Sequence, residues 1–539
     1  MGRTKQRKKH AAPALRADLQ RRDLDAGMLY GYLDRARNEP LSEEAYQDLR
    51  QAVGTLAFLQ QEVERKGASL DSLRYLLFGP KTESTSAVLG GKEAAVAPKA
   101  KKKVPGHGRN GAKAFPGAKR MQVVLEGYKS GDPCPVQGCN GKVYPQADPA
   151  TLIRMRGVAP FLATIYELER WRCNLCETVF TAKAPEGVGE AKYDATVPAL
   201  IGEFRYGAGL PHHRIERLQA CFGIPLPVST QWELVLEAAG LLQPAFSELV
   251  RQAAQGQLLH NDDTPMQILN KVSLPEKKDR KAIQTTGILS HVGEHRIALF
   301  LTGVNHAGEN LEAVLVHRAA DLTRPIQMSD ALAANLVGEA GALNTIVAHC
   351  LVHARRRFVE VEGKFPQQVR ILLRFLRLVY KLDARTRQRE MDPEARLAYH
   401  QRRSSPLMEK LKGWLADLKE GRQVEPNSGL GDAVDYMWKH WEELTLFLRV
   451  AGAPLDNSAA ERLLKRAILH RKNSLFYKTR QGAEVGDTFM SLIHTAELNG
   501  VQSFDYLVAL LRNPAAVKAD PGAWLPWNYP QALAATATA

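Results

Sequence analysis

The stretch that decides the fold runs from residue 256 to residue 303. It contains three apolar segments in succession: GQLLHNDDTPMQILN (256–270), KAIQTTGILSHVG (281–293) and HRIALFLTG (295–303). Each segment is short, rich in aliphatic and β-branched residues, and bounded by Gly, Asn or Asp, which favour turns. We therefore expect three consecutive β-strands here.

The elements after this stretch indicate what kind of sheet the strands form. The helix-like segment NLEAVLVHRA (310–319) comes next, followed by two short apolar segments, RPIQMSD (324–330) and NTIVAHC (344–350). Three strands, a helix, a strand, a helix and a strand is the order of a ribonuclease-H-like mixed sheet. Residues 353–455 have helical periodicity almost throughout, and residues 456–512 add more helix.

We therefore expect an α/β multidomain protein with a ribonuclease-H-like core. Residues 256–352 would form its first part and residues 456–512 its last helices. Residues 353–455 would be an all-helical insertion between these two parts, and residues 513–539 a C-terminal tail.

The chain before the core divides by composition. Residues 1–79 have a helical pattern, and residues 80–120, rich in Ala, Gly, Lys and Pro, have no apolar periodicity. We interpret the latter as a basic linker, which could follow a DNA backbone or be a solvated tether. Within residues 1–79, apolar residues recur at three- and four-residue steps, which fits a short coiled coil or one helix of a small bundle. These apolar residues are Leu49, Val53, Leu56, Leu59 and Val63.

Residues 186–255 have a helical pattern directly before the predicted sheet. The segment RIERLQACFGIPLPVSTQWELVLEAAG (214–240) resembles two helices joined by a turn, with Ser229 or Thr230 capping the second. This fits a DNA-binding helix-turn-helix, although any helical hairpin has the same pattern.

Four of the six cysteines occur in two pairs within residues 121–185. CPVQGC holds Cys134 and Cys139, and CNLC, 33 residues further on, holds Cys173 and Cys176. Two short loops with two thiolates each suit tetrahedral Zn²⁺, and four Cys ligands leave no open position for catalysis. We therefore expect a zinc-binding module with a structural ion. The unpaired Cys221 and Cys350 are expected to be small core residues.

The charge favours a polyanionic partner. Lys and Arg outnumber Asp and Glu by 73 to 58, giving a formal charge of +15 at pH 7, and neutralising phosphates releases counterions. A soluble basic protein without a nucleic-acid partner would have the same balance. No apolar run reaches the ~20 residues that cross a bilayer, and the basic N-terminus leads into no apolar stretch, so we expect neither a membrane partner nor a secretory signal.

Three acidic residues could form one site. Asp262 and Asp330 each follow an apolar strand, and Glu461 borders the apolar face of the helix in LDNSAAERLLKRAILHRKN (455–473). Each also has a simpler interpretation, because a lone Asp after a strand often forms a turn and Glu461 could pair with Ser458 in a capping box, with Asp456 as the other possible cap. As a set they would suit two Mg²⁺ ions roughly 3.5–4 Å apart, which cleave phosphodiesters.

Several of these segments resemble the transposases of the insertion sequence 66 family, within the DDE superfamily. LRYLLFGPKTES (73–84), LLHNDDTP (258–265), HCLVHARRRF (349–358), PLDNSAAERLLKRAILHRKNSLF (454–476) and GAWLPWNY (522–529) are similar to its motifs, and the paired cysteines lie where its zinc-binding module lies. The chain differs from the family pattern at Asp263 and Ser458, and the usual Asp-Gly pair is missing at Asp330-Ala331.

The resemblance implies a function and a set of residues. It implies Asp262, rather than Asp263, with Asp330 and Glu461 as catalytic ligands of Mg²⁺ or Mn²⁺, and structural Zn²⁺ on Cys134, Cys139, Cys173 and Cys176. The implied reaction is cleavage at transposon ends followed by strand transfer into target DNA. The residues expected to face DNA are His353, Arg355, Arg356, Arg462, Lys465, Arg471, Lys472 and Asn473.

The implied partners are double-stranded DNA, a second copy of the chain and accessory proteins of the same element. The expected location is the bacterial cytoplasm, with the nucleoid. One alternative is a catalytically inactive DNA-binding regulator derived from a transposase, and another is a structure-selective nuclease on the same core. Cys350 and His353 would supply half of a further metal site, but a structural or DNA-facing role suits them better.

Overall fold

The computed structural model forms two compact units, Met1–Lys101 and Lys102–Ala539. It describes residues 26–36, 40–50, 129–133, 137, 139–142, 144, 160–172, 179–183, 185–186, 191–270, 282–338, 345–421 and 424–538. In the first unit these include helix α1 (Ala26–Arg35) and a helical stretch at 43–50. The predicted apolar repeat from Val53 to Val63 lies outside the described residues.

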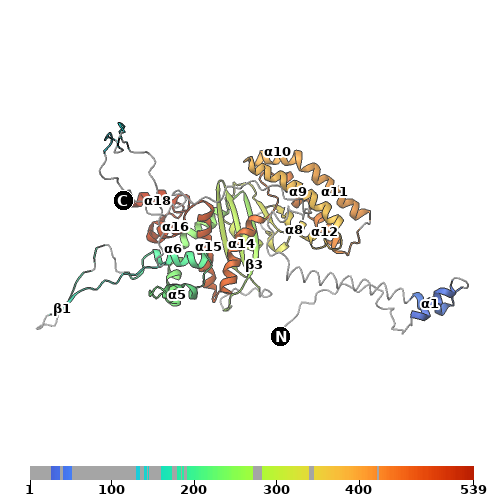
Figure 1. Ribbon diagram of the computed structural model, residues 1–539, viewed down its shortest axis with the longest axis horizontal. Helices are drawn as coiled ribbons and strands as arrows, with labels where there is room; N and C mark the ends of the chain where they lie inside the picture. Colours follow the sequence, from blue (N-terminus) through green and yellow to red (C-terminus); the bar gives the residue numbers. More distant parts are fainter. Residues whose placement is uncertain are drawn as a thin grey trace. The chain divides into compact units, whose positions relative to one another are not determined.

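A five-stranded mixed sheet lies at the centre of the second unit (Figure 1). Its order is β5-β4-β3-β6-β7; β3, β4 and β5 are antiparallel neighbours, whereas β6 runs parallel to β3 and β7 parallel to β6. This topology is consistent with the expected ribonuclease-H-like core. The strands are β3 (Leu258–Met266), β4 (Ile283–Val292), β5 (His295–Gly303), β6 (Ile326–Ser329) and β7 (Ile346–His349).

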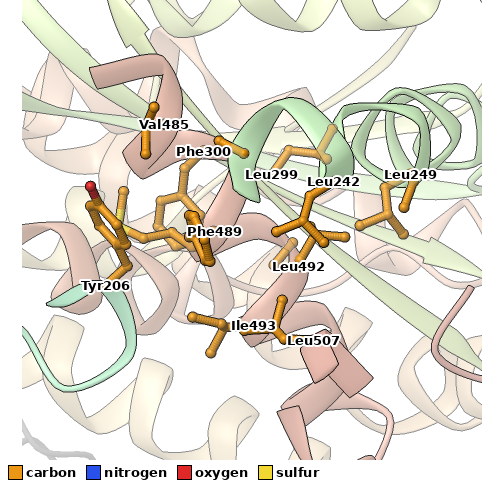
Figure 2. Packing of buried hydrophobic residues seen from close by; sticks show 14 of the residues in the cluster. Tyr206, Leu242, Leu249, Leu299, Phe300, Val485, Phe489, Leu492, Ile493 and Leu507 are labelled. Atoms are coloured by element: carbon orange, nitrogen blue, oxygen red, sulfur yellow. The ribbon is translucent and has the colours of Figure 1, made fainter. Parts of the chain in front are cut away.

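Helices from both sides of the sequence pack against this sheet. Helix α14 (Ser458–Ser474) contacts β3 and β4, α7 (Ala307–Leu315) also contacts both, and α6 (Val228–Ala253) contacts β4, β5 and α15 (Arg480–Leu498). Figure 2 shows the resulting apolar core, where side chains of α6, β5 and α15 meet. Burial of these side chains contributes about 25 cal/mol per Å² of apolar surface, so this core stabilises the packing of the helices on the sheet.

The outer edge of β5 is covered by polar side chains of α15. Residues four apart on the helix accept hydrogen bonds from backbone N–H groups two apart on the strand. Four helical residues rise ~6.0 Å and two strand residues ~6.8 Å, so the two repeats nearly match. The Arg296 N–H donates to Asn499 (3.2 Å) and the Ala298 N–H to Thr495 (3.0 Å). The Phe300 N–H donates to Ser491 (2.9 Å) and the Thr302 N–H to Asp487 (2.6 Å).

The residues between β7 and α14 form a helical insertion with a core of its own. Helices α9, α10 and α11 contact one another (Figure 1), and the insertion core continues into β6 and β7 through Met328 and Ala348. The elements are α8 (Leu351–Val359), α9 (Pro366–Gln388), α10 (Pro393–Arg403), α11 (Ser405–Glu420), α12 (Gly429–Lys439), α13 (Trp441–Leu444) and the 3-10 helix η5 (Leu446–Leu448).

The region before the sheet is helical, as expected. It contains α4 (Thr196–Gly202), the π-helix η3 (Glu203–Gly207), α5 (His212–Ala220) and α6. The predicted capping of α6 by Ser229 or Thr230 is wrong: the N-cap is Pro227 in an extended conformation, no side chain caps the helix, and both hydroxyls fall inside its first turn.

The remaining elements flank the core. The described residues between β6 and β7 include the 3-10 helix η4 (Ala333–Asn335), and the chain ends with α16 (Ser503–Arg512), α17 (Pro514–Ala519) and α18 (Tyr529–Thr538). Among the described helices, none has a long enough apolar stretch to span a bilayer.

Candidate active site

The parallel pairing of β3 and β6 brings Asp262 and Asp330 to neighbouring positions. Leu258 pairs with Ile326 and His260 with Met328, so the same register, extended by two residues, sets Asp262 beside Asp330. Paired positions of neighbouring strands face the same side of a sheet. Asp330 also accepts hydrogen bonds from Asn335 Nδ2 (2.6 Å) and the Leu332 backbone N–H (3.2 Å), which hold its Oδ1.

Glu461 reaches this face from the first turn of α14, which packs on β3 and β4. Gly287, the register partner of Asp262, allows the close approach, because a Cβ there would lie 2.9 Å from a Leu464 methyl carbon. Glu461 Oε1 lies 4.0 Å from His353 Nε2, on α8. The three predicted carboxylates therefore come from β3, the end of β6 and α14.

Asn457 connects the elements that carry these acids, and sequence reasoning did not single it out. It is fully buried at the N-cap of α14. Its Nδ2 donates to the Asn261 carbonyl (3.0 Å) and its Oδ1 lies 2.9 Å from His260 Nδ1. Its backbone N–H donates to Cys350 Sγ (3.2 Å), and its carbonyl accepts from the Glu461 N–H (3.2 Å). Asn457 thus fixes the first turn of α14 against β3 and α8.

The capping-box interpretation of Glu461 is wrong. No side chain caps α14 in the N-cap position, which Asn457 holds rather than Ser458. Instead, Asp456 Oδ1 accepts a hydrogen bond from the Ser458 N–H (3.0 Å). The Glu461 carboxylate is therefore not used by the start of its own helix.

The electrostatics of Asp262 reflect its neighbours. Burial raises the pKa of its carboxyl to about 7, against the lowering effect of a hydrogen bond from the Asp263 N–H, and the charges of Asp330 and Glu461 raise it further. Like charges held close together disfavour ionisation. Such a cluster gains stability when a cation neutralises it, and its hard oxygen donors are those that Mg²⁺ and Mn²⁺ prefer.

Asp263 has a different environment from its neighbour. Its carboxylate accepts hydrogen bonds from Thr286 Oγ1 (2.6 Å) and the Ala307 N–H (2.9 Å), and it lies 3.3 Å from His306 Nδ1. Ala307 begins α7, so the charge also interacts favourably with the helix N-terminus. Asp263 faces away from the three acids because adjacent strand residues point to opposite faces, and these contacts give it a structural role.

The residues of α14 that were expected to face DNA divide into two groups. Arg462, Lys465 and Lys472 on α14 are exposed. By contrast, Arg471 donates to Thr264 Oγ1 (3.1 Å) and to the Pro265 carbonyl, and Asn473 donates to the Gly209 carbonyl (3.1 Å). These last two residues tie α14 to β3 and to the loop before α5.

The residues from α8 differ in accessibility. His353 and Arg356 are half-buried and Arg355 is buried. Cys350 is fully buried, and burial raises the pKa of its thiol to about 12. Its Sγ accepts a hydrogen bond from the Asn457 N–H (3.2 Å), so Cys350 is a small core residue, as expected.

Of the four paired cysteines, only Cys139, which is exposed, belongs to the described residues. The antiparallel strands β1 (Arg170–Arg172) and β2 (Val179–Thr181) precede and follow the segment with Cys173 and Cys176. An antiparallel bridge between Pro133 and Lys142 likewise brackets Cys134 and Cys139. The zinc module remains a prediction.

The expectation that Cys221 is a core residue is wrong. It lies exposed at the C-cap of α5, where its thiol donates a hydrogen bond to the Arg217 carbonyl (3.3 Å). The helix ends there and turns its last residue outward, which a lone cysteine in the sequence does not reveal.

Comparison with known proteins identifies the family. The chain is 27% identical over 395 residues to the uncharacterized protein y4hP of Sinorhizobium fredii, covering 68% of each chain. It is 33% identical over 198 residues to the uncharacterized protein y4jD of the same organism, covering 36% of this chain and 38% of that one. The model of the transposase IS66 family matches residues 191–485. Since this match covers more than half of the sequence, the chain belongs to the IS66 family of transposases.

Proposed function

We propose that the chain is an active DDE transposase, which cleaves DNA at transposon ends and joins the freed 3′ ends to target DNA. Membership of a transposase family supports the general activity. The observation that carries the proposal is the convergence of Asp262, Asp330 and Glu461 on one face of the sheet, with the charges of the last two raising the pKa of the first.

The three carboxylates would hold divalent metal ions, Mg²⁺ or Mn²⁺. Held by these residues, such ions would supply activation of the attacking hydroxyl or water and charge stabilisation of the leaving oxygen of the phosphodiester. The role of the protein is to fix the ligands: Asn335 holds Asp330, and Asn457 holds the turn that carries Glu461. His353, 4.0 Å from Glu461, would orient that carboxylate or contact a phosphate.

Double-stranded DNA, from both the transposon ends and the target, is the proposed substrate. The exposed cations of α14, Arg462, Lys465 and Lys472, lie on the helix of Glu461 and would contact phosphates. The formal charge of +15 favours the same partner. Because two ends must be held together, we propose at least a homodimer on DNA, and structural Zn²⁺ bound by Cys134, Cys139, Cys173 and Cys176.

The test compares two adjacent residues of β3. Asp262→Asn removes one proposed ligand charge, whereas Asp263→Asn changes the neighbour that points to the opposite face and bonds to α7. Both purified variants and the wild type are incubated with Mg²⁺ or Mn²⁺ and DNA containing the ends of the element. We expect Asp262→Asn to bind the ends but to lose nicking and joining by at least a hundredfold, while Asp263→Asn keeps both reactions.

The outcomes separate the candidate functions. Full activity of Asp262→Asn would contradict the proposal. Wild-type protein that binds the ends but never nicks them would favour the inactive DNA-binding regulator. Nicks without joined products would favour a nuclease on the same core.

A further inference from the structure

A second group of potential metal ligands lies outside the carboxylate cluster. It consists of His349, the last residue of β7, His440, which joins α12 to α13, and Glu443 within α13. One ligand atom from each residue lies within 4.8 Å of the other two. His440 and Glu443 are three residues apart, a spacing that puts both side chains on one face of a helical turn.

Two atoms of this group are buried and have no hydrogen-bond partner among the residues that the structure describes. His349 is 3% exposed, and its Nδ1 has no partner. Glu443 Oε2 is likewise buried and unpaired. Leaving a buried polar atom unsatisfied is unfavourable, so two of them in one small group indicate a ligand that accepts lone pairs from both. A metal cation is such a ligand, since imidazole nitrogen and carboxylate oxygen both donate to it.

The geometry and the donor set suit a transition metal. In a tetrahedral site with bonds of ~2.0–2.1 Å, donor atoms lie about 3.4 Å apart. Side-chain rotations that close the present separation by up to about 1.4 Å would therefore bring the three donors to tetrahedral spacing, with water as the fourth ligand. Two imidazoles and one carboxylate suit Zn²⁺ and related ions, whereas Mg²⁺ prefers oxygen ligands alone. We propose that His349, His440 and Glu443 bind a transition-metal dication, with Zn²⁺ as the expected occupant.

The location of the group indicates what the ion would do. His349 pairs with Ser329 of β6, directly before Asp330, and the Cys350 N–H donates to the Ser329 carbonyl (3.0 Å). His440 and Glu443 belong to the helical insertion, whose α13 contacts β7. The ion would therefore fasten the insertion to the strand pair that carries Asp330. This role is separate from the metal ions proposed for the three carboxylates.

The test measures zinc per chain in the full-length protein. Wild type, His440→Gln and Glu443→Gln are stripped with a chelator, loaded with Zn²⁺ and dialysed. The control is Glu442→Gln, because Glu442 is the exposed neighbour of Glu443 and pairs with Arg449 (3.1 Å) and Lys412 (3.9 Å) instead. Zinc is counted by mass spectrometry in the monodisperse fraction from size exclusion, so that misfolded chains do not contribute.

We expect His440→Gln and Glu443→Gln each to hold one zinc ion fewer than wild type, and Glu442→Gln to hold the wild-type number. Any zinc on the paired cysteines is common to all four proteins and cancels in the difference. Asp262→Asn should also keep the wild-type number, which makes the result independent of the proposed catalytic site. Equal zinc in wild type and His440→Gln would overturn the proposal.

Discussion

Replacing Asn457 by Ala tests how the site is held together. The substitution removes two buried hydrogen bonds, from Nδ2 to the Asn261 carbonyl (3.0 Å) and between Oδ1 and His260 Nδ1 (2.9 Å). Both partners stay buried without a replacement. At ~1–3 kcal/mol for each unsatisfied group, we expect a loss of about 3 kcal/mol. With an unfolding entropy of ~2.1 cal/mol/K per residue over the unit Lys102–Ala539, this is a fall of roughly 3 °C in the melting temperature.

The same substitution should also weaken metal binding, because the Asn457 side chain holds the start of α14, one turn before Glu461, on β3. Residues that orient metal ligands typically contribute 10–100-fold to affinity. We therefore expect Mn²⁺ to bind to Asn457→Ala about 10–100-fold more weakly than to wild type. Free Mn²⁺ measured by electron paramagnetic resonance in the absence of DNA gives this affinity directly.

Gln231→Ala is the matched control. Gln231 is also fully buried, its Oε1 lies 3.1 Å from His212 Nδ1, and its Nε2 donates to the Leu226 carbonyl (2.8 Å). It should therefore lose a similar amount of stability and keep wild-type Mn²⁺ binding. If Asn457→Ala were destabilised as expected but bound Mn²⁺ as wild type does, the assigned positioning role would be refuted.

Two further predictions concern pH. Burial and the neighbouring acids raise the pKa of Asp262 to about 7. Because a bound metal displaces the proton of this carboxyl, the affinity for Mn²⁺ should fall about tenfold per pH unit below pH 7. An affinity for Mn²⁺ that stays constant between pH 5 and pH 7 would contradict this prediction. Burial also raises the pKa of Asp487 to about 8, against the lowering effect of the hydrogen bonds that its carboxylate accepts from Thr302. The contribution of Asp487 to the stability of the fold is therefore present below pH ~4 and is lost as the pH rises towards 8. Asp487→Asn should remove this dependence in thermal melts at pH 5 and pH 8.5, and an unchanged difference between the two melts would count against it.

The sheet was predictable because its strands are continuous in the sequence. The segments around Asp262 and Asp330 are short apolar runs that end in acidic residues, and strand patterns of this kind depend mainly on local composition. Sequence pattern also favoured Glu461, which borders the apolar stripe of α14. The pairing of β3 with β6, which sets the two aspartates side by side, requires contacts between residues almost 70 positions apart.

The positioning residues could not be predicted in this way. Asn457 resembles an ordinary helix-capping residue in the sequence, and its importance comes from partners 196 and 197 positions away. Asp263 is indistinguishable from Asp262 by composition. The resemblance to the family favoured Asp262, and the alternation of β3 puts the two side chains on opposite faces of the sheet. The cap of α6 was mispredicted because Ser229 and Thr230 both suit that position, whereas the conformation of Pro227 decides where the helix begins.

The cover that α15 provides for β5 has a consequence for protein synthesis. The strand is complete at Gly303, but the residues that satisfy its outer N–H groups, from Asp487 to Asn499, are translated almost 200 residues later. Until then the ribosome-bound chain has an open strand edge, which can pair with other chains. Copies of the gene interrupted before codon 487 should therefore yield insoluble product rather than a soluble fragment that competes with the full-length protein for its proposed DNA substrate.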